Sequence, residues 1–243
     1  MKALPVIAGP LLFALWGSAF ALPALAGEIV GPCTGREAEG STPVCGSGAA
    51  ALRVIAGTVS PDGRHAFAWR RAGGDPAATG DDALDYLVRL DDGAVLALIE
   101  GSYWSFDGMV ANHAGEHAVW SPDGRAVIEV VDAKWETRSL NLFRIGAAGE
   151  VAGRGDLLAL VDAEVRREML REHPGIDPSR YVLSVTGDPD ITLADDGTIR
   201  LAVVLEVPKS SDDPLLGFDL VLSAPPDGRP ARLVSIQPSS TVE

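Results

Sequence analysis

The sequence predicts an all-β protein made of about three antiparallel units and one short helix. The string Ser-Pro-Asp-Gly-Arg occurs at residues 60–64 and again at residues 121–125, 61 positions later. Apolar runs of strand length flank both copies. A looser copy, Ala-Asp-Asp-Gly-Thr at residues 194–198, also precedes such a run. Turn signals that recur with strand-like runs are typical of repeated β units.

Each Ser-Pro-Asp-Gly string predicts the tip of a β-hairpin. Serine can hydrogen-bond into the turn, proline fixes φ near the type I value, and aspartate tolerates the bridge conformation. Glycine in the fourth place accepts a positive φ, which closes a type I turn with a glycine bulge. The two strings therefore predict return strands at residues 65–69 and 126–131.

The motif resembles the repeat of Tol-type, WD-like β-propellers, in which a strand ending in Trp-Ser-Pro-Asp-Gly-Arg leads into the next strand of the blade. Residues 119–131 match this pattern closely, and residues 59–69 match it with Val59 in place of Trp. The resemblance covers residues 52–153, and residues 185–236 keep only the rhythm of strands and turns. Closed propellers have about 4 to 8 blades. About three units imply a partial or open propeller, or a sandwich.

Residues 1–26 predict a cleaved signal peptide. Lys2 precedes an apolar run over residues 3–22, and Ala24-Leu25-Ala26 fits a cleavage site. A retained membrane anchor is the alternative, but Pro23 and the small residues favour removal. No later stretch approaches the roughly 18 apolar residues of a membrane helix, so no stable membrane insertion is expected. The protein is predicted to be periplasmic or secreted.

The charge of the chain argues against nucleic acid and anionic membranes as partners. Twenty basic residues against 34 acidic ones give a net charge of −14. Removal of Lys2 with the signal peptide leaves 19 against 34, so nucleic acid and anionic membranes should repel the protein. Arginine outnumbers lysine 17 to 3, which is typical of GC-rich bacterial genomes and favours a periplasmic location.

Residues 27–51 predict a glycine-rich loop that precedes a single β-repeat domain at residues 52–243. This loop contains both cysteines, Cys33 and Cys45. In an oxidising compartment, two cysteines this close predict one disulfide. A redox-active pair is the alternative, but it would normally have Cys-x-x-Cys spacing.

The first unit contains four predicted strand segments after the loop. Residues 72–82 form a Gly-, Ala- and Asp-rich connection, and Asp91-Asp92-Gly93 predicts a second hairpin. The predicted strands are residues 52–59 with an interruption, 65–69, 86–90 and 94–99. This count equals that of a propeller blade.

An aromatic cluster follows the first unit. Tyr103, Trp104 and Phe106 lie within a stretch of four residues, and Trp135 lies in a predicted loop of the second unit. Aromatic residues on loops are favoured anchors of binding sites, so these four residues are the binding candidates. The alternative is that the cluster wedges between adjacent sheets as part of the core.

The string His113-Ala114-Gly115-Glu116-His117 matches the H-x-x-E-H pattern and resembles the inverzincin zinc motif. His113 and His117 can ligate one metal only if the segment is helical. Gly115 and the strand predicted directly afterwards argue against a helix. The metal site is kept as an alternative, and no cofactor is expected.

The remaining elements are one helix and a third unit. Leu158, Val161, Val165 and Met169 recur at helical spacing, and Asp162 followed by Glu164 predicts a helix over residues 162–172, ended by His173-Pro174-Gly175. The carboxylates of Asp188, Asp190, Asp195 and Asp196 invite a calcium interpretation, but they lack EF-hand spacing and aspartate is a preferred turn residue.

The sequence contains no Gly-x-Ser-x-Gly elbow, phosphate loop or dinucleotide fingerprint. We therefore expect a non-catalytic binding or adaptor protein that uses loops at one end of its sheets to bind another protein or a small ligand. One alternative is a periplasmic hydrolase or metal-dependent enzyme that uses His113, Glu116 and His117. The other is a structural domain that covers its edge strands by forming a homo-oligomer.

Overall fold

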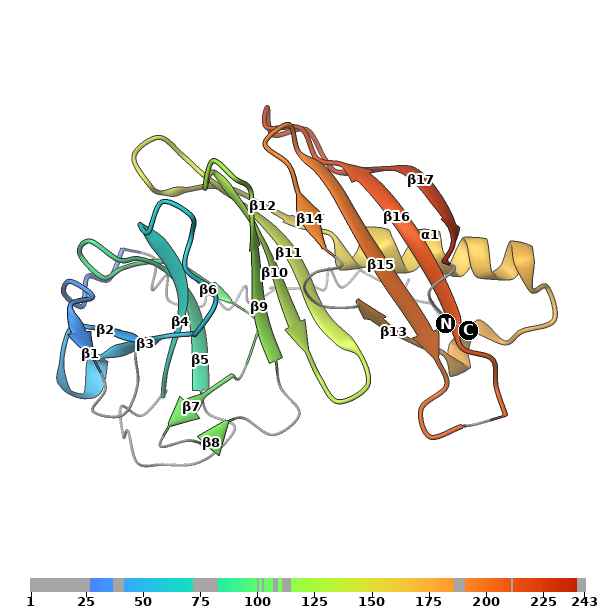
Figure 1. Ribbon diagram of the computed structural model, residues 1–243, viewed down its shortest axis with the longest axis horizontal. Helices are drawn as coiled ribbons and strands as arrows, with labels where there is room; N and C mark the ends of the chain where they lie inside the picture. Colours follow the sequence, from blue (N-terminus) through green and yellow to red (C-terminus); the bar gives the residue numbers. More distant parts are fainter. Residues whose placement is uncertain are drawn as a thin grey trace, which may run out of the picture.

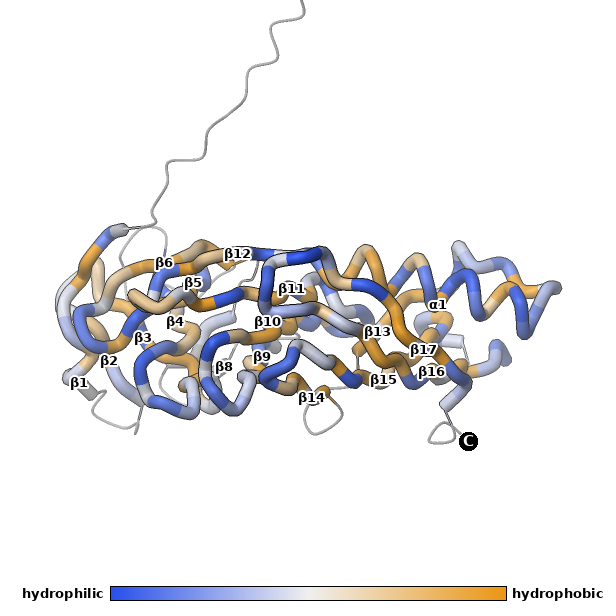
Figure 2. Tube along the Cα trace, turned by 90° about the horizontal axis from the view of Figure 1, so that it is seen from above, coloured by the Kyte–Doolittle hydropathy of each residue, from blue (hydrophilic) through white to orange (hydrophobic). Residues whose placement is uncertain are grey.

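Three antiparallel sheets, none of them closed, follow one another along the long axis of the molecule (Figures 1 and 2). The computed structural model describes residues 27–36, 42–71, 83–99, 101, 103–106, 109–110, 115–185, 191–210 and 212–239. The all-β class and the prediction of about three antiparallel units are confirmed over these residues. The predicted signal peptide lies outside them.

The first sheet contains six strands in chain order. They are β1 (Gly35–Arg36), β2 (Pro43–Cys45), β3 (Leu52–Val54), β4 (His65–Arg71), β5 (Ala83–Arg89) and β6 (Ala94–Ile99). The N-terminal residues run along β6, where the N–H of Gly27 donates to the carbonyl of Val95 at 2.9 Å. The predicted disulfide between Cys33 and Cys45 is confirmed and ties this segment to β2. The segment expected to be a loop thus adds strands β1 and β2 and the short 3-10 helix η1 (Gly48–Ala50).

The second and third sheets are also built from strands that are neighbours in the chain. The second sheet has the order β12 (Val151–Asp156), β11 (Thr137–Ile145), β10 (Ala126–Asp132) and β9 (Gly115–Trp120). The third has the order β13 (Val182–Val185), β15 (Thr198–Glu206), β16 (Leu216–Ser223) and β17 (Arg232–Pro238), and β14 (Thr192–Leu193) pairs with β15. Strands β7 (Ser105–Phe106) and β8 (Met109–Val110) form a separate hairpin.

The second sheet is buried on both faces because side chains alternate along its strands. Ile128 and Val130 of β10 face the third sheet, whereas Val127 and Val131 face the first sheet. Each face packs into a core cluster of its own. A third cluster lies on the other face of the first sheet, around Tyr86.

Helix α1 (Leu158–Glu172) begins before the predicted residue 162. The carboxylate of Asp156 accepts a hydrogen bond from the N–H of Ala159 at 3.2 Å, whereas Asp162 pairs with Arg166 within the helix. The buried side chains of α1 join the core between the second and third sheets. A 3-10 turn, η2 (Pro178–Arg180), follows. In the described part of the chain, no helix has the length and apolar character needed to cross a membrane.

The two Ser-Pro-Asp-Gly turns have matching hydrogen bonds. Ser60 Oγ donates to Asp62 Oδ1 at 2.6 Å, and the N–H of Gly63 donates to the carbonyl of Ser60 at 2.9 Å. In the second turn, Ser121 Oγ donates to Asp123 Oδ1 at 2.7 Å, and Gly124 repeats the backbone bond at 2.9 Å. Both predicted turns are therefore confirmed.

The arm before the first turn differs from the prediction. Residues 57–59 form no strand, because Gly57 has a φ of +79° and the side chain of Thr58 makes hydrogen bonds that the backbone of a strand would make. Thr58 Oγ1 accepts the N–H of Phe67 at 3.1 Å and donates to the carbonyl of Ile55 at 2.8 Å. The hydroxyl thus satisfies a backbone group that a strand partner would otherwise satisfy.

Glycine is required at Gly197 for two separate reasons. Its φ is +81°, and a Cβ would overlap the carbonyl oxygen of Ala224, a residue whose N–H donates to the carbonyl of Gly197. Gly63 has a similar φ of +72°, but a Cβ there would meet nothing within 4 Å. Alanine at Gly63 therefore costs only the strain of a positive φ, whereas alanine at Gly197 adds the cost of the steric overlap with Ala224.

We predict that Gly63→Ala lowers the free energy of unfolding by about 1–2 kcal/mol, the cost of a left-handed alanine. Gly197→Ala should cost at least about 2 kcal/mol more, because the backbone around Ala224 must move. Urea unfolding of both variants measures the difference. Equal losses would contradict the close approach of this turn to Ala224.

Candidate functional site

The predicted aromatic binding residues are not gathered in one place. Tyr103 and Trp104 are partly buried and pack against the core between the first and second sheets. Trp135 lies in the turn between β10 and β11, is 37% exposed, and has the ammonium of Lys134 5.0 Å from its ring. Phe106 belongs to β7, and its side chain lies outside the described part. Their role in binding stays a prediction.

The structure does not form the metal site of the His-x-x-Glu-His alternative from its described members. Glu116 and His117 are successive residues of strand β9, so their side chains lie on opposite faces. Glu116 is buried toward the first sheet, whereas His117 Nε2 lies 3.7 Å from Asp132 Oδ2 on the other face. His113 lies outside the described residues. Among the residues that are described, no group of three His, Cys, Asp or Glu side chains is placed to hold a metal ion.

The aspartates of the calcium interpretation act in turns where they are described. Asp196 Oδ1 accepts the N–H of Thr198 at 2.8 Å, and Asp195 Oδ1 accepts the N–H of Asp123 at 3.0 Å. Asp188 and Asp190 lie outside the described residues.

Three buried carboxyl groups lie between the first two sheets. We call Asp85, Glu116 and Glu129 the carboxylate cluster. Asp85 and Glu129 are fully buried, and Glu116 is only 4% exposed. Asp85 is on β5, on the face that carries Leu87, while Glu116 and Glu129 are on β9 and β10, on the face that packs against it. Strand alternation in both sheets therefore brings the three groups to one interface.

The three groups of the carboxylate cluster differ in the number of hydrogen bonds that they accept. Glu129 Oε2 accepts from Ser139 Oγ at 3.0 Å and from Asn141 Nδ2 at 2.6 Å, both on β11. Asp85 Oδ2 accepts the N–H of Tyr103 at 2.9 Å. Among the residues that the structure describes, no donor reaches Asp85 Oδ1 or either oxygen of Glu116. A proton on one of these two carboxyl groups is the donor that this pair needs.

The electrostatics of the pair favour such a proton. Burial raises the pKa of Asp85 to about 6. Burial, followed by the negative charges of Asp85 and Glu129, raises the pKa of Glu116 well above its usual value. We therefore assign the proton to Glu116 at neutral pH. Two neighbouring carboxyl groups that hold one proton can act as an acid and a base, or can hold two sheets together.

Sequence reasoning singled out Glu116 for another reason and missed Asp85 and Glu129. The signal was present in the strands themselves. Asp85 and Glu129 are the inward charged residues of the runs ALDYLV and AVIEVV, which are otherwise almost wholly apolar. A charged residue is rarely buried unless it is paired, so such a position marks a polar site inside a core.

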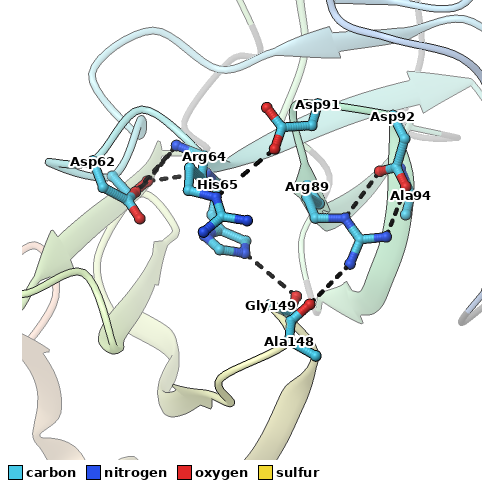
Figure 3. A network of polar contacts seen from close by, with 10 residues as sticks. Asp62, Arg64, His65, Arg89, Asp91, Asp92, Ala94, Ala148 and Gly149 are labelled. Carbon is cyan, nitrogen blue, oxygen red and sulfur yellow. Dashed lines mark hydrogen bonds and ion pairs between the residues drawn. The ribbon is translucent and has the colours of Figure 1, made fainter.

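A second candidate site lies at the other end of the second sheet, where the turns meet in a row. Asp62 of the first turn packs against Gly124 of the second turn. A Cβ at Gly124 would lie 3.4 Å from the carboxyl carbon of Asp62. The N–H of Asp123 then bonds Asp195 of the third turn. Figure 3 shows the turn between β11 and β12 held by the first sheet, through His65 Nε2 to the carbonyl of Gly149 and Arg89 Nη1 to that of Ala148, both at 3.3 Å.

A pocket of about 550 Å³ opens between the turns of the second and third sheets. We call it the turn-end pocket; it is lined by residues 121–126, 194–197 and 226–228 in part, and by the end of β11. Arg144 of β11 lines it and donates from Nη2 to the carbonyl of Ala224 at 2.9 Å. Burial lowers the pKa of this guanidinium. Its other N–H groups have no acceptor among the described residues.

No family model, curated protein or solved structure matches this chain.

The carboxylate cluster predicts that stability falls as the pH rises from about 4 to above 6. An unfolded carboxyl group titrates near pH 4, and the folded protein keeps its protons to a higher pH, so ionisation favours unfolding across this window. For Asp85 alone, with its pKa of about 6, the loss is about 2–3 kcal/mol. We expect Asp85→Asn and Glu116→Gln to raise the melting temperature at pH 8 much more than at pH 4.

The quantity to compare is the difference in melting temperature between wild type and variant at each pH, because other groups also titrate. His65 has a pKa lowered by burial and acts in the opposite direction near pH 6. Carboxylates with lowered pKa values, such as Glu28 beside Arg70, change the stability only at a pH below this range. Glu136→Gln changes an exposed carboxylate and should follow the wild type. A difference curve that is flat from pH 4 to pH 8 would contradict the shared proton.

Proposed function

We propose that the protein is a non-catalytic binding or adaptor protein that acts outside the cytoplasm, and that its ligand binds in the turn-end pocket. The observation that carries the proposal is Arg144, a partly buried cation that lines a pocket built from three turns. Binding sites are commonly concavities with a few fixed polar groups. Loops on a rigid scaffold supply such groups.

The chemistry of the pocket favours a ligand that carries a carboxylate. The three aspartates that line it already accept hydrogen bonds. Asp123 accepts from Arg125, Asp195 from Asp123, and Asp227 from Arg229. Arg144, in contrast, has unused donors in a partly desolvated place. A guanidinium matches a carboxylate through two parallel hydrogen bonds, and such bonds are stronger than neutral ones.

Export and a propeller-like arrangement belong to the same proposal. A disulfide is typical of proteins that fold in oxidising compartments, which agrees with the predicted signal peptide and a periplasmic or secreted location. The three sheets are antiparallel and stack face to face, and each carries a similar turn at one end. This arrangement supports blade-like units of an open propeller. In this arrangement the repeated turns would form the binding end.

Arg144→Gln should weaken binding of a carboxylate ligand at least about tenfold, because a charge-assisted bond is worth about 1.5–3 kcal/mol. The probes are succinate and a tripeptide with a free carboxyl terminus, followed by calorimetry and by nitrogen-15 chemical shifts. Arg144→Lys should retain part of the affinity. Arg138→Gln removes an exposed arginine from the same strand and should bind as the wild type does. Equal binding of the tripeptide and its carboxyl-terminal amide would refute the assignment.

The carboxylate cluster favours a second candidate function, a hydrolase with Asp85 and Glu116 as the base and acid. The supporting observation is a pair of buried carboxyl groups whose pKa values are both raised, which is typical of acid–base sites. Hydrolysis of chromogenic glycosides, esters or peptides that is lost in both Asp85→Asn and Glu116→Gln would support it. Turnover that survives both substitutions would exclude this pair.

A further inference from the structure

A second cavity, of about 420 Å³, adjoins the turn-end pocket and shares Arg144 with it. It is lined by strand β12, by the start of helix α1, which follows β12 directly in Figure 1, and by residues 228–231 between β16 and β17. We call this cavity the β12 groove. Arg144 therefore lies where the groove and the turn-end pocket meet.

Two glycines of β12 keep the β12 groove open. Gly153 pairs with Arg144 and Gly155 pairs with Leu142, so both glycines lie on the face that is turned to the third sheet. Neither glycine has a positive φ. A Cβ at Gly155 would meet nothing within 4 Å, and a Cβ at Gly153 would meet only Arg144 Cδ, at 3.9 Å. Backbone conformation and packing therefore do not require glycine here, and glycine inside a strand often marks the close approach of a ligand.

The wall next to the two glycines is apolar. Leu142 and Leu157 belong to the core cluster between the second and third sheets, and Leu160 and Ala231 pack against that cluster. All four residues line the β12 groove, and the last two are only partly buried. A hydrocarbon chain in the groove would therefore extend the core at its margin, and burial of each methylene group favours binding.

The charge at the β12 groove is opposite to that of the whole chain. Three arginines and one aspartate line the groove, although the chain has a net charge of −14. The carboxylate of Asp227, which lines the turn-end pocket, is held by Arg229 Nε at 2.8 Å. Arg144 donates to a neutral carbonyl, and within the described part of the chain no carboxylate forms an ion pair with it. A cation thus lies beside an apolar groove.

We propose that the β12 groove binds the hydrocarbon chain of a linear carboxylic acid whose carboxylate is bound by Arg144. The inference rests on the proposed function and names the class of its ligand, a medium-chain fatty acid. At roughly 30 Å³ per non-hydrogen atom, the share of a water molecule in the liquid, an eight-carbon acid occupies roughly 300 Å³. It therefore fits a groove of about 420 Å³.

Calorimetry of the wild type with acetate, butyrate, hexanoate and octanoate tests the proposal. Each pair of added methylene groups should tighten binding about tenfold, because burial of one methylene group is worth a factor of about three to four. 1-Octanol has the chain without the carboxylate and should bind at least about tenfold more weakly than octanoate. Equal affinities for acetate and octanoate, or for octanol and octanoate, would overturn the proposal.

Gly155→Leu puts a side chain into the β12 groove and should weaken octanoate binding at least about tenfold. Binding of succinate should stay as in the wild type, because Gly155 does not line the turn-end pocket. Gly175→Leu is the matched control: Gly175 is exposed after α1, a Cβ there also meets nothing within 4 Å, and it does not line the groove. Octanoate that binds to Gly155→Leu as tightly as to this control would contradict the groove.

The inference and the proposed function fail in different ways. If Arg144→Gln abolishes succinate binding but octanoate binds the wild type no more tightly than acetate, the proposed function stands and the groove does not bind the chain. If none of these acids binds, both are wrong. A tripeptide that ends in leucine and binds more tightly than octanoate would overturn the assignment to a fatty acid. Circular dichroism shows whether each variant folds, and the chain-length series needs no variant.

Discussion

The arrangement of the whole molecule depends on the second sheet, because it is the layer that is buried on both faces. Strands β10 and β11 send alternate side chains into two different core clusters, so one set of residues holds the first sheet and the other holds the third. Burial of each large aliphatic side chain contributes about 1.5–3 kcal/mol. A one-residue shift of register would exchange the two sets. Polar residues on these strands must therefore find partners within the layer, as Glu129 does with Ser139 and Asn141.

The repeated turns add a second constraint at one end of the sheets. Each turn is closed by its own aspartate and glycine, and neighbouring turns then touch through Asp62 and Asp123. Their regular contacts fix how far apart the ends of successive sheets lie. The turn-end pocket opens where the second and third sheets meet, and Arg144 bridges it to the carbonyl of Ala224. A local motif thus determines the position of a site that is formed between sheets.

The sequence predicted those features whose partners are close in the chain. The Ser-Pro-Asp-Gly turns and the Cys33–Cys45 bridge depend on residues within a short segment. The start of α1 was wrong because Asp156 and Asp162 are both plausible caps, and only the folded chain shows that Asp156 bonds the first turn. The carboxylate cluster was missed for a different reason. Asp85 and Glu116 belong to different sheets, and neither the pairing of strands nor the stacking of sheets can be derived from turn chemistry.

The carboxylate cluster also has an energetic consequence for how the sheets separate. Three carboxyl groups removed from water weaken the interface between the first and second sheets, because buried charge costs more than its hydrogen bonds return unless a proton or a cation compensates. Between the second and third sheets the core cluster is formed by apolar side chains, and the buried Thr137 accepts the N–H of Val185 there. If the protein loosens at high pH, the weaker of the two contacts should open first, so the first sheet should lose hydrogen-exchange protection before the third. Partly independent stability of stacked layers is expected of repeat proteins, whose units contact only their neighbours.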